Sequence, residues 1–479
     1  MINGPFVGRE HERSLLNDLL SKKVASLVVI KGRRRIGKSR LVQEFARDKK
    51  FYVFSGLAPN KKTTAQMQRD EFARQLSTQT ALPEVKADDW SKLFLLLFDK
   101  VKRGRIVILF DEISWMALKD PGFLGKLKNA WDLYFKNNPN LILILCGSVS
   151  SWIEKNIINS TGFFGRISLK LTLEELKLND CDALLRHIGF NRSPLEKLMI
   201  LSLTGGIPWY IELINPGYSA MENIKKLCFE RDGIMVGEFD FIFHELYGRR
   251  WENCKKIVEY LADGPAQYLD IVSALNYPSS GALSTYLKDL LISGFISRDC
   301  AWHLTSDKDS LLSKFRLSDN YLRFYLKYIA PRLNKIMKNQ FLDVSSPILP
   351  NWEGIMGLQF ENLVLNNRKL LFQHLGIKPD EIISDNPFFQ RKTVKQKGCQ
   401  IDYLIQTKHN TLFVCEIKFS KNEVGPSIIE AVQEKISRMS VPRGYACLPV
   451  LINVAGVKKE VTDKNYFYKI IDFTQFLSR

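Results

Sequence analysis

A short loop near the start of the chain constrains the fold more than any other segment. Residues 32–39 read GRRRIGKS, which fits the pattern GxxxxGK[ST] in full. The loop follows an apolar stretch at residues 26–30 and precedes a segment with helical spacing at residues 40–47. Glycine lets the backbone curl between strand and helix so that its N–H groups face phosphate oxygens. The segment therefore predicts a phosphate-binding loop inside an α/β domain.

The side chains of this loop suit a nucleoside triphosphate with its metal ion. We expect Lys38 to neutralise charge on the outer phosphates and Ser39 to bind Mg²⁺, so ATP and Mg²⁺ are the expected cofactors. The alternative is a loop that matches by chance and binds nothing, and the flanking strand and helix argue against it. The residues expected at the nucleotide are Gly32, Arg33, Arg34, Arg35, Ile36, Gly37, Lys38, Ser39 and Arg40.

A second apolar strand ends in two acids. Residues 106–110 read IVILF and are followed by Asp111 and Glu112. We expect Asp111 to hold Mg²⁺ through water, and Glu112 to orient or deprotonate the water that attacks the γ-phosphate. The alternative is that both acids only cap the next helix. Beside the phosphate loop, the pair predicts an ATP-hydrolysing site.

The distribution of apolar residues predicts several modules. Continuous apolar runs at residues 51–54, 106–110 and 141–146 are typical of a parallel sheet buried on both faces. From about residue 170 the strands give way to helical patterns. A winged helix is predicted from three helices and a hairpin. The helices are at 251–265, 268–275 and 279–293, and the hairpin strands at 302–304 and 314–317.

Charge and cysteine usage limit the partners and the compartment. The 479 residues carry a formal net charge of +18, which favours nucleic acid, DNA in particular, over an anionic membrane. The eight cysteines form no CxxC pair and no zinc spacing, so we expect reduced, buried thiols. The sequence contains neither a basic-then-apolar leader nor an apolar run of about 18 residues, and we therefore expect a cytoplasmic protein without a membrane partner.

Several segments resemble the archaeal-type ATPases related to the STAND and AAA+ classes of P-loop proteins. They are FVGRE at 6–10, the loop at 32–39, LFDEISWM at 109–116, LILILCGS at 141–148 and FGR at 164–166. The resemblance implies that Ser148 senses the γ-phosphate and that Arg166 is an arginine finger, which would make a homo-oligomer possible. It also implies a helical lid whose GGIP motif brings Pro208 near the nucleotide. The alternative for Arg166 is an ion pair with a local acid.

A cluster of charged residues is predicted near the C-terminus. If residues 401–406 and 412–419 pair as a hairpin, Asp402 falls opposite or diagonal to Glu416. Glu416 and Lys418 project from the same face of one strand. Asp402 and Glu416 would then hold a divalent metal ion, with Lys418 positioning water or stabilising a phosphate. The alternative is an acid and a lysine that only pair on an exposed strand.

This order of elements resembles the PD-(D/E)xK nuclease fold, which the archaeal-type ATPases often carry at the C-terminus. The resemblance implies two further catalytic residues, Glu361 on the preceding helix and Gln433 on the following helix. Many members of the fold are known only as binding or unassigned modules, so cleavage and binding both stay open. The predicted layout is a P-loop core at 1–170, a helical lid at 171–245, a winged helix at 246–335 and a restriction-endonuclease-like α/β domain at 350–479.

Two basic segments bear on nucleic-acid binding. We expect residues 391–397 and 316–338 to be either solvated surface or contacts to a nucleic-acid backbone. The third winged-helix helix offers only Lys288, without arginine, asparagine or glutamine for base contacts, so we expect it to pack rather than to read sequence. The leading hypothesis is an ATP-dependent switch coupled to a metal-dependent nuclease. The alternative is a signalling ATPase whose terminal domains bind DNA or protein without cutting.

Overall fold

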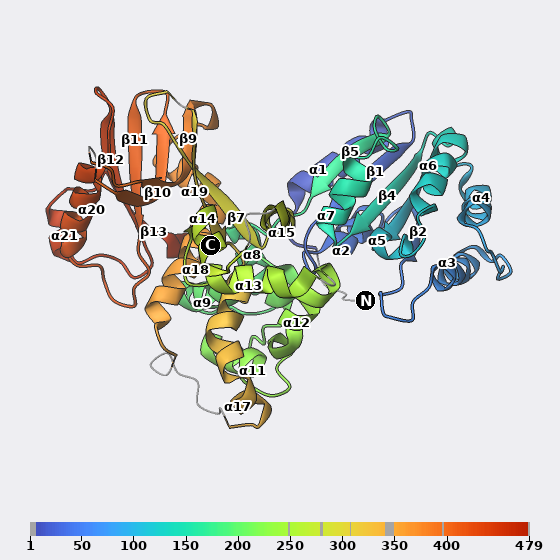
Figure 1. Ribbon diagram of the computed structural model, residues 1–479, viewed down its shortest axis with the longest axis horizontal. Coiled ribbons are helices and arrows are strands. Elements are labelled where there is room, and N and C mark those ends of the chain that lie inside the picture. Colours follow the sequence, from blue (N-terminus) through green and yellow to red (C-terminus); the bar gives the residue numbers. More distant parts are fainter. Residues whose placement is uncertain are drawn as a thin grey trace. The chain divides into compact units, whose positions relative to one another are not determined.

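The computed structural model describes residues 6–247, 250–277, 281–306, 308–340, 349–394 and 397–477. It contains two compact units, Met1–Leu176 and Lys177–Arg479 (Figure 1). Each unit is described by itself.

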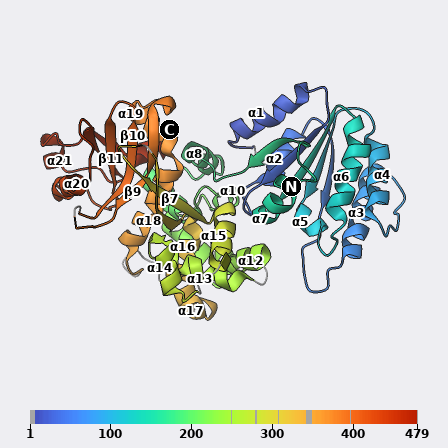
Figure 2. The ribbon, with the colours of Figure 1, turned by 45° about the horizontal axis from the view of Figure 1, so that its top comes forward.

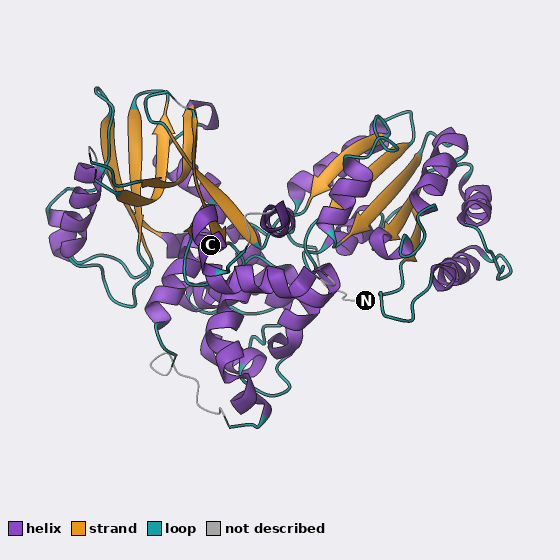
Figure 3. Ribbon diagram, viewed as in Figure 1, coloured by secondary structure: helices purple, strands orange, loops and turns teal. Residues whose placement is uncertain are grey.

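A parallel five-stranded sheet forms the centre of the first unit. The strand order is β2 (Lys50–Ser55), β3 (Ile106–Asp111), β4 (Leu141–Gly147), β1 (Ser26–Lys31) and β5 (Ile167–Thr172). All neighbouring strands run parallel. β4 is buried along its whole length, and Figure 3 shows helices on both sides of these strands. The predicted parallel α/β sheet is therefore confirmed.

Helices of the first unit supply the layers that bury this sheet. On one face, stacked and edge-on rings of Phe54, Phe72, Phe94 and Phe110 join strands β2 and β3 to two of the helices. The helices are α1 (Glu10–Asp18), α2 (Lys38–Phe45), α3 (Ala65–Thr80), α4 (Trp90–Val101), α5 (Ile113–Met116), α6 (Phe123–Leu133) and α7 (Ser150–Ile153).

Strand β5 corrects the boundary expected at residue 170. It pairs with β1 from Ile167 to Thr172, so the first unit continues to Leu176. Its side chains alternate between covered and exposed, because β5 is an edge strand with one polar face. The sequence prediction relied on continuous apolar runs, and β5 contains no such run, so this strand was missed.

The second unit begins with helices. They are α8 (Leu178–His187), α9 (Pro194–Thr204), α10 (Pro208–Glu212), α11 (Ala220–Cys228) and α12 (Ile234–Tyr247). Helices α13 (Trp251–Leu261), α14 (Tyr268–Ala274) and α15 (Gly281–Ile292) follow, with the short strand β6 (Ala266–Gln267) between the first two. The helices expected at 251–293 are thus present; residues 278–280, where the third was expected to begin, lie outside the described ranges.

The hairpin after α15 differs from the one expected. Strand β7 (Ile296–Trp302) pairs antiparallel with β8 (Asp309–Leu317), and β6 completes a three-stranded sheet in the order β6-β8-β7. Ile296 lies opposite Leu317, and Trp302 opposite Asp309. The first strand of the hairpin is therefore 296–302, and the expected strand at 302–304 begins where the turn starts.

A second five-stranded sheet fills the C-terminal part of this unit. Its order is β13 (Lys469–Asp472), β12 (Ala446–Asn453), β11 (Thr411–Ile417), β10 (Cys399–Thr407) and β9 (Ile382–Gln390). β9, β10 and β11 are antiparallel neighbours, whereas β11, β12 and β13 are parallel. The hairpin expected from β10 and β11 is confirmed. The helices here are α16 (Asn320–Phe324), α17 (Leu333–Met337), α18 (Trp352–Asn366), α19 (Arg368–Leu375), α20 (Ser427–Arg438) and α21 (Lys459–Asp463).

Apolar packing joins the β7–β8 hairpin to this sheet. The Trp302 side chain is buried in one cluster with Phe388, Ile401 and Leu404, and its indole N–H donates to the Gln406 side-chain oxygen at 2.5 Å. Figure 2 shows β7 beside β9. The helices at the start of the unit are also tied in, because Lys197 of α9 donates to the Leu477 carbonyl at 3.0 Å. The modules expected at 171–245, 246–335 and 350–479 therefore form one compact body.

Membrane-spanning helices and disulfides were not expected. Across the described residues, no helix combines the length and the apolar character needed to cross a bilayer. All eight cysteines lie in the described part and none is paired in a disulfide; six are buried. Reduced thiols stay a prediction.

Candidate functional site

The phosphate loop connects the carboxyl end of β1 to the first turn of α2. Gly32 has a φ of 155°, and a β-carbon there would lie 2.6 Å from the Leu173 carbonyl oxygen, so only glycine fits. Gly37 adopts the left-handed conformation at the N-cap of α2, with a φ of 91°. The Lys38 ammonium donates to the carbonyls of Gly32 at 2.9 Å and Arg33 at 3.0 Å. The lysine therefore points back over the loop, where it would meet an outer phosphate.

The acids at the end of β3 reach the loop. The Ser39 hydroxyl donates to the Asp111 carboxylate at 2.6 Å. Glu112 accepts from both the backbone N–H of Ser148, at 3.0 Å, and its hydroxyl, at 2.9 Å. Burial raises the pKa of the Glu112 carboxyl above its ordinary value, although the Lys38 ammonium and the Ser148 bonds act in the opposite direction. A buried carboxyl whose pKa is raised towards neutrality is suited to accept a proton from water.

Sheet order explains why these residues meet. β4 lies between β1 and β3, so the carboxyl ends of all three parallel strands form one edge. That edge carries the loop after β1, Ser148 after β4, and Asp111 and Glu112 after β3. The structure thus brings together Lys38, Ser39, Asp111, Glu112 and Ser148 as the sequence predicted.

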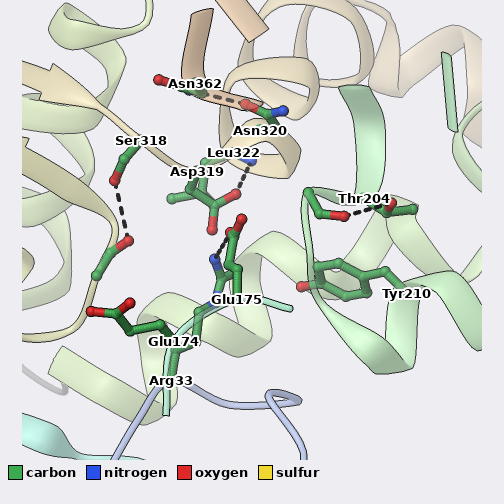
Figure 4. Close-up of polar contacts among 12 residues, drawn as sticks. Arg33, Glu174, Glu175, Thr204, Tyr210, Ser318, Asp319, Asn320, Leu322 and Asn362 are labelled. Carbon is green, nitrogen blue, oxygen red and sulfur yellow. Dashed lines mark hydrogen bonds and ion pairs between the residues drawn. The ribbon is translucent and has the colours of Figure 1, made fainter. Parts of the chain in front are cut away.

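Arg9 also supports this loop and was not among the predicted site residues. Its buried guanidinium donates to the Ile36 carbonyl at 3.2 Å and the Glu174 carbonyl at 2.6 Å. It therefore ties the loop to the segment that follows β5. Arg33 of the loop reaches the same segment through an ion pair with Glu175 at 3.5 Å (Figure 4). The left-handed conformation of Arg9, with a φ of 65°, appears only in the structure, so the motif FVGRE carried no local signal of this role.

The structure pairs Arg166 with a local acid. Its guanidinium makes two bonds to the Asp132 carboxylate, at 2.9 and 2.8 Å. The pair lowers the pKa of Asp132 to about 2. The alternative given for Arg166 is therefore present, and a role as an arginine finger stays a prediction. Pro208 occupies the first turn of α10 in the second unit, and its predicted contact with nucleotide also stays a prediction.

In the second unit, the predicted acids come together on neighbouring strands. Asp402 of β10 accepts the backbone N–H of Ile417 at 2.9 Å, which places it beside the end of β11. The Glu416 carboxylate is buried and pairs with the Lys418 ammonium at 2.8 Å. Burial first, and the Glu416 charge second, raise the pKa of Asp402. The predicted meeting of Asp402, Glu416 and Lys418 is thus observed, and we call these three residues the acid cluster.

Glu361 of α18 interacts electrostatically with the acid cluster. Burial first, and the Asp402 charge second, raise the pKa of its carboxyl to about 7, although Arg316, Arg323 and Lys418 act in the opposite direction. These influences place the carboxyl within electrostatic reach of Asp402 and Lys418, as the sequence predicted.

Lys435 of α20 was not predicted and is the residue that links the two acids. Its ammonium contacts Glu416 at 2.5 Å and Asp402 at 3.3 Å. Burial lowers the pKa of Lys435, but these two carboxylates outweigh it and raise the pKa above its ordinary value. Gln433 is exposed on α20, about 200° around the helix from Lys435, so the structure does not bring it to the acid cluster.

The carboxylates of the acid cluster are suitable ligands for a hard divalent cation, but the Lys435 ammonium competes for them. Carboxylate oxygens of Asp402 and Glu416 are suitable ligands for Mg²⁺. In the structure they are bridged by the Lys435 ammonium instead. Within the described ranges, no group of three or more His, Cys, Asp or Glu side chains is arranged to hold a metal ion. A cation at this position therefore requires Lys435 to move away from the carboxylates.

Helix α18 connects three parts of the second unit. Gln359 donates to a main-chain carbonyl of α9, and Asn362 accepts from Arg316 of β8. Asn362 also donates to the Asn320 side chain at 2.9 Å (Figure 4). Glu361, between them in sequence, interacts electrostatically with Asp402 and Lys418. One helix therefore contacts the initial helices and the hairpin and carries a carboxyl near the acid cluster.

The basic segment at 316–338 proves to be partly core. Arg323 is fully buried and donates to the Leu317 carbonyl at 2.7 Å, and burial lowers its pKa to about 10. Arg316 is buried in an ion pair with Asp299 at 2.9 Å. Neither can contact a nucleic-acid backbone, so that part of the expectation is wrong. In the other segment, Lys395 lies outside the described residues.

Comparison with known proteins bears on the first part of the chain. Residues 6–214 match a family described as an ATPase domain predominantly from Archaea. This part of the chain is similar to that family of ATPase domains, and the match covers less than half of the chain. An uncharacterized protein of Methanocaldococcus jannaschii is 28% identical over 364 residues, which cover 75% of this chain and 76% of that protein.

Solved structures share parts of the fold at low identity. The Walker-type ATPase of Pyrococcus abyssi is 18% identical, with a TM-score of 0.48, over 67% of this chain and 96% of that chain. The ORC2 protein of Aeropyrum pernix is 16% identical, with a TM-score of 0.42, over 71% of this chain and 97% of that chain. Since both TM-scores lie below 0.5, neither likeness adds to the assignment.

Proposed function

We propose that this protein hydrolyses ATP as a switch and that its second unit cleaves nucleic acid, DNA in particular, with a divalent metal ion. The observation that carries the proposal is the meeting of Asp402, Glu416 and Lys418 in a chain that also has a complete ATPase edge. Both constellations are suited to phosphate chemistry.

The ATPase half rests on the edge of the first sheet. The Lys38 ammonium is bonded to two loop carbonyls, contacts that a phosphate can replace with a stronger charge-assisted bond. Ser39 and Asp111 would hold Mg²⁺, which neutralises phosphate charge when bound. Glu112 is placed to accept the proton of the attacking water, and its bonds to Ser148 give it a fixed orientation.

The nuclease half rests on the acid cluster. Asp402 and Glu416 would hold the divalent ion, which lowers the pKa of bound water and stabilises charge on the scissile phosphate. Lys418 is nearly half exposed beside Glu416 and would contact that phosphate. Glu361, whose pKa is raised to about 7, would exchange a proton near the same place.

The domain assignments support a switch. Residues 171–245 would be a helical lid, 246–335 a winged helix and 350–479 a restriction-endonuclease-like domain. Since α18 contacts both α9 and the acid cluster side of the unit, a movement of the lid would be transmitted to Glu361 through a rigid helix. We further propose a cytoplasmic protein that forms homo-oligomers through Arg166 in at least one nucleotide state.

A second candidate function is favoured by Lys435. Because its ammonium bridges Asp402 and Glu416, the acid cluster is already charge-balanced without a metal ion. This arrangement is compatible with a regulatory ATPase whose second unit binds DNA or protein without cleavage, because such a protein needs no metal ion at the acid cluster.

One experiment separates the two candidates. Purified protein is incubated with circular and linear DNA, single strands and RNA, in Mg²⁺ or Mn²⁺, with and without ATP. Cleavage that is lost in Asp402→Ala and Lys418→Ala, but kept in the exposed control Asp463→Ala, supports the nuclease. If wild type leaves all substrates intact, or the first two variants cut as well as wild type, the nuclease half is wrong.

The ATPase half has its own test. Lys38→Ala should abolish ATP binding, whereas Glu112→Gln should bind ATP and lose at least about a hundredfold in turnover, because the proton acceptor is gone. Calorimetric titration and phosphate release measure the two quantities. Unchanged turnover in both variants would exclude hydrolysis at this loop.

A further inference from the structure

Three hollows lie around the β7–β8 hairpin, with volumes of about 480, 460 and 630 Å³. Arg391 lines all three of them, and Gln267 lines two, so we refer to the three hollows together as the groove. All lining residues belong to the second unit. Figure 1 shows β7 and β9, which supply part of the lining.

The groove is lined by cations. No aspartate or glutamate is among the described residues that line the three hollows. Lys314 donates to the Gln400 amide oxygen at 3.1 Å, and Arg298 donates to the Ser313 hydroxyl at 2.9 Å, so both bond to neutral acceptors. Asp270 is near enough to act on Lys314. The six cations are Lys288, Arg298, Lys314, Arg391, Lys435 and Arg438.

Apolar side chains lie between these cations. Leu269 and Leu311 line the groove and are exposed, and Tyr268 lies beside them. The Lys314 ammonium lies 5.0 Å from the centre of the Phe389 ring. A surface that alternates cations with apolar and aromatic groups matches a single strand, whose phosphates and unstacked bases are both accessible. A duplex offers phosphates but hides its base faces, so the exposed leucines would have no partner on it.

The groove and the acid cluster have one neighbour in common, Lys435. Lys435 and Arg438 line the groove; Lys435 also bridges Asp402 and Glu416 at 3.3 and 2.5 Å, and Arg438 pairs with Glu434. A phosphate that arrives along the groove therefore competes with the two carboxylates for the same ammonium. When Lys435 turns to the phosphate, Asp402 and Glu416 lose their shared counterion and become available to a divalent cation.

We propose that this groove binds single-stranded nucleic acid, with Lys435 exchanging its carboxylate partners for a strand phosphate at the entrance to the acid cluster. The proposal rests on the proposed function and names the substrate form for its second unit. The β7–β8 hairpin and the β9–β10 edge supply the surface. Helix α15 adds one cation, Lys288, together with Ser284, Leu287 and Leu291, and its Asp289 pairs with Arg250 at 2.5 Å.

The test measures binding without cleavage. Fluorescein-labelled dT20, U20 and a 20-base-pair duplex are titrated with full-length protein in EDTA without nucleotide, and binding is followed by anisotropy. We expect wild type to bind the single strands more tightly than the duplex. Lys314→Gln/Arg391→Gln should weaken strand binding by about tenfold or more, and should lower the salt slope by about 1.4 because two phosphate contacts are lost.

A charge-matched control lies elsewhere in the same unit. Lys459→Gln/Lys464→Gln removes the same charge from exposed positions at α21 and should leave strand affinity within about twofold of wild type. Melting temperatures of both double variants are measured to verify folding. The proposal is overturned if the control loses as much affinity as the groove variant, if wild type prefers the duplex, or if wild type does not bind the strands.

The two proposals fail differently. If wild type cleaves nucleic acid but Lys314→Gln/Arg391→Gln binds strands as wild type does, the groove is wrong and the nuclease stands. If the groove variant loses strand binding but wild type cleaves nothing, the groove stands and the nuclease half fails.

Lys435→Gln should raise the affinity of the acid cluster for Mn²⁺, measured by electron paramagnetic resonance. An unchanged or lower affinity for Mn²⁺ contradicts the exchange of partners by Lys435.

Discussion

Truncation of Trp302 tests whether the hairpin and the C-terminal sheet are one cooperative body. The side chain is buried against Phe388, with ring centres 5.4 Å apart, and it donates to Gln406, which is 104 residues away in sequence. Removal of a buried tryptophan side chain costs about 3–5 kcal/mol, and loss of its hydrogen bond adds about 1 kcal/mol. A total near 5 kcal/mol is a large part of the stability of a typical domain.

Hydrogen exchange read by mass spectrometry reports where this stability is lost. We expect Trp302→Ala to accelerate exchange in β10 and β11, not only in the hairpin, by about a thousandfold for each 4 kcal/mol lost. Trp302→Phe keeps the ring contact and should show a smaller effect. Leu311→Ala, at an exposed position of the same hairpin, should show none. If acceleration in Trp302→Ala stops at residues 296–317, the hairpin and the sheet are independent and the reasoning is wrong.

Two further predictions concern arginines of the first unit. Arg9→Ala should weaken ATP binding by about tenfold, because two carbonyls that hold the phosphate loop lose their donor. Calorimetry measures the affinity for ATP. The control Arg13→Ala, which removes a more exposed arginine of helix α1, should bind ATP as wild type does. Arg166→Ala should destabilise the unit only slightly, since the pair with Asp132 lies near the surface and is screened by solvent. Because the pKa of Asp132 is lowered to about 2, this loss should be full above pH 4 and should fade as the pH falls from about 4 to 2. Denaturant titrations at several pH values check it, and a loss that grows as the pH falls would contradict the ion pair. An arginine finger would instead lower ATP turnover at protein concentrations that allow oligomers.

The ATPase edge was predictable because its requirements are local. A phosphate loop needs glycines and a lysine at fixed spacing after one strand and before one helix, and residues 32–39 contain them consecutively. Asp111, Glu112 and Ser148 follow apolar strands in the same way. The hairpin geometry that brings Asp402 to Glu416 is likewise a short-range consequence of two strands and a turn.

Strands β5 and β9 were not predicted, because their residue patterns resemble those of loops. β5 alternates polar and apolar residues, and β9 contains Pro387 and lies at the edge of its sheet. A strand of this kind is stabilised by the neighbour with which it pairs. For β5 that neighbour is β1, which is distant in the sequence, whereas β9 pairs with β10, the next strand along the chain. The predicted boundary at residue 170 was wrong for this reason.

The sequence by itself determined the phosphate loop, the two acids at the end of β3, and the acid cluster, because each depends on spacing within one strand, turn or helix start. Only the tertiary structure decided that Lys435 rather than Gln433 faces the acids, that Arg323 is core rather than surface, and that Trp302 joins the hairpin to the C-terminal sheet. Those outcomes depend on which helix face packs inward and on contacts between residues far apart in the chain. Burial and charge pairing at such contacts are set by the assembled fold, not by the spacing of residue types.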